Sequence, residues 1–186
     1  MYKICQSAQS AKRQRELEKG LLQLLLRRSY EDISVSEICQ HMCIPRKSFY
    51  RYFSSKDGAL YALIDHTLAQ FFEMPTPQHK TRGTAVGDLD LFFVFWHNNQ
   101  DFLEALLRNS LGGILVERAT SFALREGLLP QKFKSNSQAV QEMSLTFAVS
   151  GLLSMTIHWH LGGYPLSPSE MTRLAVNMLT TPLLNP

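Results

Sequence analysis

The chain has 186 residues, of which 45% are apolar and 19% charged, and it carries a net charge of +3. This composition is typical of a folded globular protein and excludes an intrinsically disordered chain. Apolar runs such as residues 91–96 are far shorter than the roughly 20 residues that a membrane-spanning helix needs, so we expect no membrane partner.

Basic residues are concentrated in the first third of the chain. Residues 1–60 hold 11 of the 19 Lys and Arg residues but only 6 of the 16 Asp and Glu residues, whereas residues 61–186 are mildly acidic. A nucleic-acid-binding surface leaves this asymmetry in a sequence, but so does an ordinary solvated surface. A sequence motif is therefore needed to distinguish a nucleic-acid-binding surface from an ordinary solvated surface.

The basic segment begins with two predicted helices. Leucines recur at helical spacing and predict an amphipathic helix over residues 12–28, with Glu18 among the intervening polar positions. Ser34 and Glu37 have the spacing of a capping box, which predicts that a second helix starts there and runs to about Met42.

A third and a fourth helix follow. Pro45 suits the first turn of a helix over residues 46–53, because its missing amide proton is not needed there. The second and third helices together predict a helix-turn-helix, whose second member could lie in a DNA major groove. Ser54-Ser-Lys-Asp57 caps a longer fourth helix that ends at Met74.

These residues resemble a known family. The segment Ser34–Asp57, above all Phe49-Tyr50, Tyr52-Phe53 and Ser55-Lys56-Asp57, is similar to the DNA-binding head of the TetR/AcrR-type bacterial transcriptional regulators. The resemblance implies a homodimeric transcription factor on a palindromic operator, usually a repressor that leaves the DNA when a small molecule binds. The alternative is an activator or co-regulator with the same head, whose body binds a protein partner instead.

The predicted DNA contacts fall into two classes. Cations and a serine near the start of the third helix are placed to reach base edges, since Arg and Lys pair with guanine. Tyrosine hydroxyls, which match family positions that touch the DNA backbone, and polar residues at helix starts would contact phosphate. The predicted set is Ser34, Arg46, Lys47, Ser48, Tyr50, Arg51, Tyr52 and Lys56.

Other side chains of the head have different expected places. Phe49 and Phe53 are predicted to form the small core that holds the three helices together. Lys12 and Arg13 would add nonspecific attraction to DNA from an N-terminal arm, or belong to a solvated terminus.

The remainder of the chain is predicted to be helical, which gives an all-α fold with about nine helices. The expected helices span residues 86–98, 100–109, 111–127, 135–162 and 168–182, the last signalled by the capping residues Ser167 and Glu170. We expect residues 1–55 to form the arm and DNA-binding domain, and residues 56–186 the effector-binding and dimerisation domain.

The body is similar to the TetR branch typified by regulators of dihydroxyacetone kinase, through Phe95–Leu107, Val149–Leu153 and Trp159. This resemblance implies that the body dimerises through its last two long helices and holds an effector pocket. The dimer residues would be Met143, Phe147, Gly151, Met155, Leu174, Met178 and Leu179. The pocket would be lined by Phe92, Phe93, Phe95, Trp96, His97, Phe102, Phe122, Phe147, His158 and Trp159. Few charges surround these aromatic residues, so an apolar or aromatic effector is expected, although aromatic residues at this spacing also form plain cores.

The cysteines indicate the cellular compartment of the protein and do not indicate a metal or redox site. An odd number, Cys5, Cys39 and Cys43, and the absence of an apolar N-terminal stretch predict a protein of the reducing cytoplasm. Cys43 stands in the turn where the family usually has glycine, a position that tends to need a positive φ. Cys39 is expected to pack between helices without metal or redox chemistry.

No enzymatic motif is present in the sequence. It has no nucleophile elbow, no phosphate-binding loop of the Gly-x-x-x-x-Gly-Lys type and no His-Glu-x-x-His zinc motif. We therefore expect neither catalysis nor a cofactor or metal.

Overall fold

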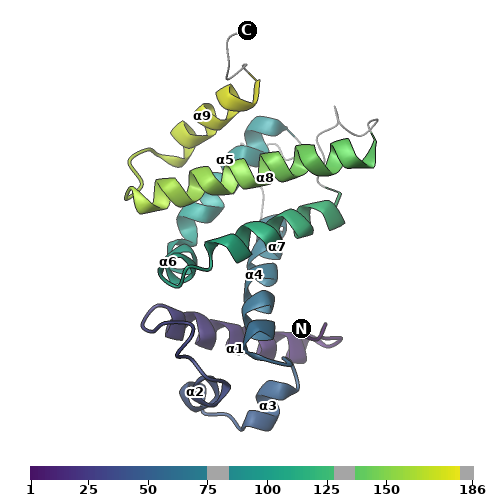
Figure 1. Cartoon of the computed structure of the whole chain (residues 1–186), viewed down its shortest axis with the longest axis vertical. Coiled ribbons are helices and arrows are strands. Elements are labelled where there is room, and N and C mark those ends of the chain that lie inside the picture. Colours follow the sequence, from purple (N-terminus) through teal and green to yellow (C-terminus); the bar gives the residue numbers. More distant parts are fainter. Residues whose placement is uncertain (75–83, 128–136, 181–186) are drawn as a thin grey trace. The chain divides into compact units, whose positions relative to one another are not determined.

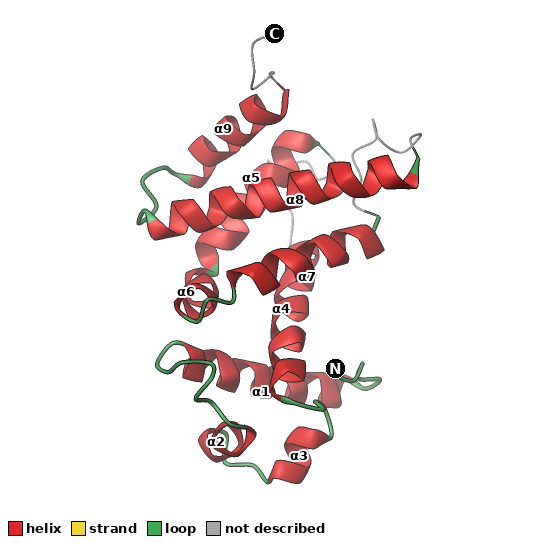
Figure 2. Ribbon diagram, in the orientation of Figure 1, coloured by secondary structure: helices red, strands yellow, loops and turns green. Residues whose placement is uncertain are grey.

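The computed structural model describes residues 1–74, 84–127 and 137–180 (Figure 1). These ranges contain nine helices and no strand, which confirms the predicted all-α class (Figure 2). The helices are α1 (Ala8–Leu25), α2 (Val35–His41), α3 (Arg46–Tyr50), α4 (Lys56–Glu73), α5 (Ala85–Asn98), α6 (Gln100–Arg108), α7 (Gly112–Arg125), α8 (Gln138–Leu161) and α9 (Pro168–Thr180). Residues 135–136 and 181–182, predicted to extend the last two helices, lie outside the described residues. None of the described helices is long and apolar enough to cross a membrane.

Side-chain caps set several helix starts. At α9 the capping box is complete: Ser167 Oγ accepts from the Glu170 amide at 3.3 Å, and the Glu170 carboxylate accepts from the Ser167 amide at 2.8 Å. At α2 it is half formed. Ser34 Oγ accepts from the Glu37 amide at 3.1 Å, but the Glu37 carboxylate pairs with the guanidinium of Arg28 instead of the Ser34 amide.

Helix α1 is displaced towards the N-terminus from its predicted range. It begins at Ala8 because Ser7 Oγ accepts from the Ser10 amide at 3.2 Å. Its last carbonyls find distant partners: Asn109 Nδ2 donates to Leu25 O at 3.0 Å, and Arg108 donates to Leu26 O at 2.7 Å. The sequence contains no local sign of this cap, since the donors lie more than eighty positions away.

Helix α3 is shorter than predicted. Pro45 is its N-cap, with φ −65° and ψ 145°, and is not part of its first turn. The helix ends at Tyr50, and residues 51–52 continue as a turn in which the Phe53 amide donates to Phe49 O at 3.1 Å.

The turn between α2 and α3 has the backbone that the sequence predicts. Cys43 adopts φ 51°, in the left-handed region that favours glycine. Cys43→Gly is therefore expected to raise the free energy of unfolding by about 0.5–1 kcal/mol, measured by urea denaturation. The control Cys43→Ala keeps a Cβ and should not stabilise. Equal stability of the two variants would contradict a strained turn.

The head has a compact apolar core. Phe49 and Phe53 are at most 1% exposed and their ring centroids lie 5.1 Å apart, which confirms their predicted place. Leu21 of α1 and Ile38 of α2 are fully buried as well. Because Phe49 is turned inward, the neighbouring residues of α3 face outward.

The first residues of the chain lie along the start of α4. The Lys3 amide donates to Tyr52 O at 2.9 Å, and the Ser54 amide donates to Met1 O at 3.1 Å. A Cβ on Gly58 would lie 2.4 Å from Met1 O, so only glycine permits this approach. The segment is thus fixed to the head, and Lys12 and Arg13, which were expected in an N-terminal arm or a solvated terminus before the first helix, lie within α1.

The chain divides into two compact units. The first comprises Met1–Leu68 and Glu104–Phe122, and the second comprises Ala69–Leu103 and Ala123–Pro186. Helix-turn-helix residues belong to the first unit, together with part of α7. The functional division at residues 55 and 56 stays a prediction.

Helices α5 and α9 pack together in the second unit. Their shared core includes Leu89 and Phe93 from α5, Met171 and Ala175 from α9, and Trp159 from α8. The Trp159 indole donates to the Leu166 carbonyl at 2.8 Å, so its polar atom is satisfied.

Candidate nucleic-acid interface

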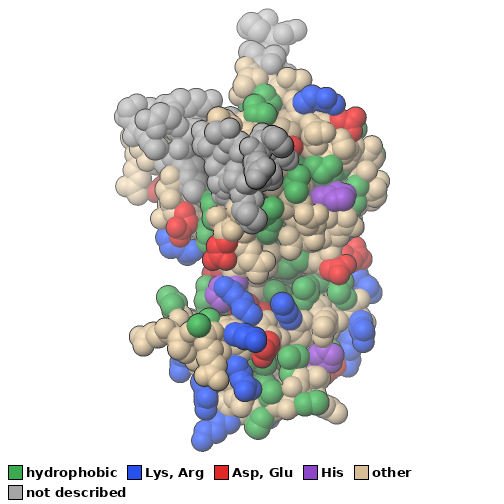
Figure 3. Space-filling view, turned by 180° about the vertical axis from the view of Figure 1, so that it is seen from behind, with side chains coloured by type: hydrophobic (Ala, Val, Ile, Leu, Met, Phe, Trp, Pro, Cys, Tyr) green, Lys and Arg blue, Asp and Glu red, His purple; other side chains and the backbone are tan. Residues whose placement is uncertain are grey.

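The outward face of α3 carries the predicted base contacts. Arg46 and Lys47, at the start of the helix, are exposed, and Ser48 is half-buried. Figure 3 shows Lys and Arg side chains gathered over the part of the surface that the head occupies. A helix that buries Phe49 and presents two cations at its N-terminal end can place them against base edges.

Arg46 and Tyr50 are held together on this face. The guanidinium of Arg46 donates to Tyr50 Oη at 3.3 Å and lies 5.9 Å from the ring centroid. Tyr50 is 45% exposed, so its hydroxyl is accessible to a phosphate. Arg51, which caps the end of α3, is exposed too.

The other predicted contacts have structural partners within the head. Ser34 caps α2, as described above. Lys56 Nζ donates to Tyr30 O at 2.6 Å and to Glu31 O at 3.4 Å, and lies 4.2 Å from the Tyr30 ring centroid. Lys56 thus holds the loop between α1 and α2 in place through these carbonyls. A contact of Lys56 with DNA stays a prediction.

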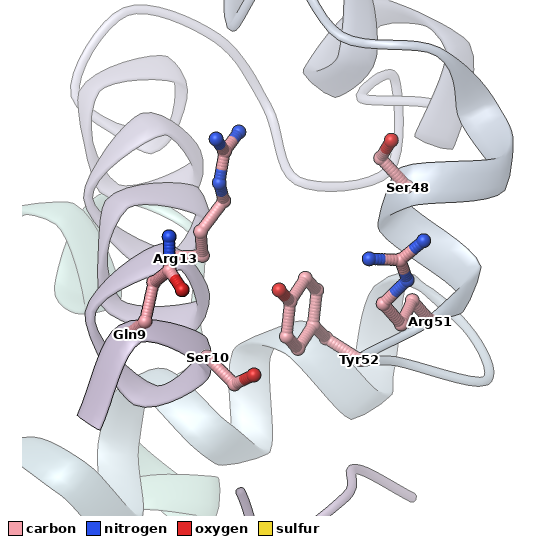
Figure 4. A pocket seen from close by; sticks show the side chains of 6 residues that line it. All are labelled: Gln9, Ser10, Arg13, Ser48, Arg51 and Tyr52. Carbon is pink, nitrogen blue, oxygen red and sulfur yellow. The ribbon is translucent and has the colours of Figure 1, made fainter. Parts of the chain in front are cut away.

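Tyr52 differs from Tyr50 in its surroundings. It is only 6% exposed, and its ring packs 6.3 Å from that of Phe53. In Figure 4 its hydroxyl points towards α1. A contact of the Tyr52 hydroxyl with DNA would therefore lie in the space between α1 and α3.

That space is a cavity of about 350 Å³. It is lined by Gln9, Ser10 and Arg13 from α1 and by Ser48, Arg51 and Tyr52 from α3 and the turn after it (Figure 4). Gln9 and Ser10 were not among the site residues predicted from the sequence. Gln9 and Arg13 stand four residues apart on one helix face, but nothing in the sequence indicates that this face meets α3.

A buried ionic network lies within the same unit. The Asp65 carboxylate accepts from Arg118 Nε at 2.6 Å and from Tyr2 Oη at 2.7 Å, and a second Arg118 nitrogen donates to it. Beside it, Glu18 lies 2.8 Å from His66 Nδ1 and 3.3 Å from Arg15. Glu18 was expected on the polar face of α1, but it is only 2% exposed. Burial raises the pKa of Glu18 to about 8, with Asp65 acting in the same direction and Arg15 opposing both.

Most of the predicted effector-pocket aromatics are core residues. Phe93, Phe95, Trp96, Phe102 and Trp159 are at most 3% exposed, and Phe122 is 9% exposed. Phe92 and His97 are half-buried, and the His97 ring centroid lies 5.6 Å from that of Trp159. Phe147 and His158 are exposed. A pocket role for these residues stays a prediction.

The predicted dimer residues are largely exposed. Met143, Phe147 and Gly151 recur every four positions along α8, and the first two are 65% and 69% exposed. Leu174, Met178 and Leu179 of α9 are exposed as well. Met155 is the exception, since it packs against the core that contains Phe93 and Trp159.

The cysteines contribute no site in the described part of the chain. Cys39 is buried and Cys43 exposed, and all three thiols are free. No group of three or more potential metal ligands occurs among the described residues.

Comparison with known proteins gives one family match. Residues 19–63 match the family model described as bacterial regulatory proteins, tetR family. No curated protein sequence matches the chain.

Several solved structures share the fold of nearly the whole chain. The dihydroxyacetone kinase operon activator DhaS is 20% identical, with a TM-score of 0.55 over 89% of this chain and 93% of that one. A transcriptional regulator (TerR/AcrR family) from Aquifex aeolicus VF5 is 14% identical, with a TM-score of 0.59 over 89% and 96%. The fatty acid degradation regulator FadR from Bacillus halodurans is 12% identical, with a TM-score of 0.63 over 91% and 95%. Residues 19–63 thus match the tetR family of bacterial regulatory proteins, and the chain as a whole shares the fold of solved transcriptional regulators.

Proposed function

We propose that the protein is a homodimeric repressor in the cytoplasm, which binds a palindromic operator and leaves it when a small apolar or aromatic molecule binds. The observation that carries the proposal is the outward face of α3, where Arg46, Lys47 and Tyr50 are exposed around the buried Phe49. Repression and homodimerisation are also typical of the TetR family.

The proposed dimer is supported by the apolar surface of α8 and α9. Large side chains such as Met143 and Phe147 are exposed there, and water-exposed apolar stripes of this kind favour association. A dimer also suits the head, because two heads related by a twofold axis contact a palindrome while one contacts few base pairs.

The proposed ligand response rests on the aromatic residues of the second unit. Phe92 and His97 are half-buried beside fully buried rings, so an apolar ligand could contact these two side chains at the edge of the aromatic cluster. A compound that raises the melting temperature and also weakens DNA binding supports the repressor; stabilisation without release of DNA contradicts it.

The alternative is an activator or co-regulator with the same head. It is supported by the similar fold of a protein described as an operon activator. A transcription reporter separates the two: loss of the protein should raise expression from a repressed promoter and lower expression from an activated one.

Base contacts by α3 are tested by two single substitutions. Arg46→Ala and Lys47→Ala are each expected to lower specific affinity about tenfold and to relax sequence preference at one position of each half-site. Selection from a randomised duplex library, with Lys19→Ala on the exposed face of α1 as the matched control, measures both effects. If the two variants select the same sequence as the control, α3 does not read bases.

A further inference from the structure

We propose that the cavity between α1 and α3 binds one phosphate of the DNA backbone, with Arg13 and Arg51 as its two cationic contacts. This inference rests on the proposed function, because its ligand belongs to the operator duplex. It assigns α1 a direct part in positioning DNA, whereas Arg13 was expected only to attract DNA nonspecifically from an N-terminal arm or to belong to a solvated terminus.

The chemistry of the lining fits a phosphate. Two guanidinium groups, three hydroxyls and one amide surround the cavity, and no carboxylate lines it. The non-bridging oxygens of a phosphodiester only accept hydrogen bonds, and each of these six side chains can donate. At about 350 Å³, the cavity has room for the phosphate and several waters, since a water takes up roughly 30 Å³.

The two arginines differ from others in the same unit. Arg15, Arg28 and Arg118 each pair with a carboxylate. Within the described residues, neither Arg13 nor Arg51 has a hydrogen bond or ion pair. Two unpaired cations on opposite walls of one cavity repel each other, so an anion between them is favoured.

The cavity also lies at a position that the DNA backbone can reach. Gln9, Arg13 and Arg51 are exposed, so the cavity reaches the surface. Ser48 and Arg51 follow the base-contacting end of α3, and Figure 4 shows the α1 side chains facing them. A phosphate bound here would tie α1 and α3 to the same strand and so fix how α3 enters the groove.

The test compares full-length variants on a random-sequence 30-base-pair duplex by fluorescence anisotropy between 50 and 250 mM salt, so no operator need be known. Arg13→Gln and Arg51→Gln are each expected to weaken binding about tenfold and to reduce the salt slope. Arg27→Gln is the matched control: it removes an exposed arginine just after α1, away from the cavity. It should change affinity less than about twofold.

The double variant separates one shared phosphate from two independent contacts. If both arginines bind one phosphate, the Arg13→Gln/Arg51→Gln protein loses about one unit of salt slope in total. A loss of about two units, or an Arg13→Gln variant that behaves like Arg27→Gln, overturns the inference. If the unsubstituted protein itself does not bind duplex DNA, the proposed function fails instead.

A second measurement excludes a free anion as the ligand. At constant ionic strength, 5 mM inorganic phosphate in place of chloride should leave the melting temperature unchanged, because a single phosphate group lacks the contacts of the duplex. Stabilisation by inorganic phosphate that disappears in Arg13→Gln, while the same substitution leaves the affinity for the duplex unchanged, would assign the cavity to a small anion and overturn the DNA-backbone assignment.

Discussion

Replacing Arg118 by methionine is expected to lower the free energy of unfolding by about 3–5 kcal/mol. The Asp65 carboxylate is only 6% exposed and receives two donors from Arg118 and one from Tyr2. Methionine preserves much of the arginine's volume but leaves the buried carboxylate with the Tyr2 hydroxyl alone. Urea denaturation at pH 7 gives the difference.

Two further variants show that the loss comes from the buried charge. Asp65→Leu/Arg118→Met removes both charges and should recover most of the stability, because a buried pair is often replaceable by apolar residues. Arg125→Met breaks an exposed pair with Glu126 and should cost less than about 0.5 kcal/mol. A loss below about 1 kcal/mol in Arg118→Met would contradict the importance of this pair.

Glu18 is expected to make stability depend on pH in the unusual direction for a carboxyl group. Its pKa is raised by burial from 4.5 to about 8, so the folded protein holds this proton more tightly than the unfolded chain does. The resulting stability is fully present below pH 4.5 and is lost as the pH rises through about 8, by on the order of 4–5 kcal/mol.

Glu18→Gln isolates this effect. Glutamine has the shape of the protonated side chain and can keep the contact with His66, but it cannot ionise. Compared with the unsubstituted protein, the variant should gain stability steadily between pH 5 and pH 8.5 in urea denaturation. A difference between the two proteins that is constant over this range would show that Glu18 is already ionised in the folded state.

Local features of the fold are predictable from the sequence. The caps at Ser34 and Ser167 mark helix starts, and Phe49 and Phe53 are core residues because their spacing puts them on one face. The positive φ of Cys43 was implied by the resemblance to a family that usually has glycine at this turn position. Each of these depends on interactions within a few residues, which a sequence displays directly.

Features that join distant segments are not predictable in the same way. Glu18 and Asp65 are buried because partners 48 or more positions away, His66 and Arg118, reach them. The helical spacing of the leucines alone predicted that Glu18 lies on the solvent-exposed face of α1. The cavity between α1 and α3 arises likewise, because two polar helix faces, each ordinary by itself, meet across it.

Sequence-specific binding of duplex DNA by the helix-turn-helix can be measured by selecting duplexes from a randomised library with the full-length protein. We expect enrichment of an inverted repeat whose half-sites are about one helical turn apart, with binding that weakens steeply as salt increases. Enrichment of no sequence, together with no binding at 50 mM salt, would show that the helix-turn-helix does not bind duplex DNA.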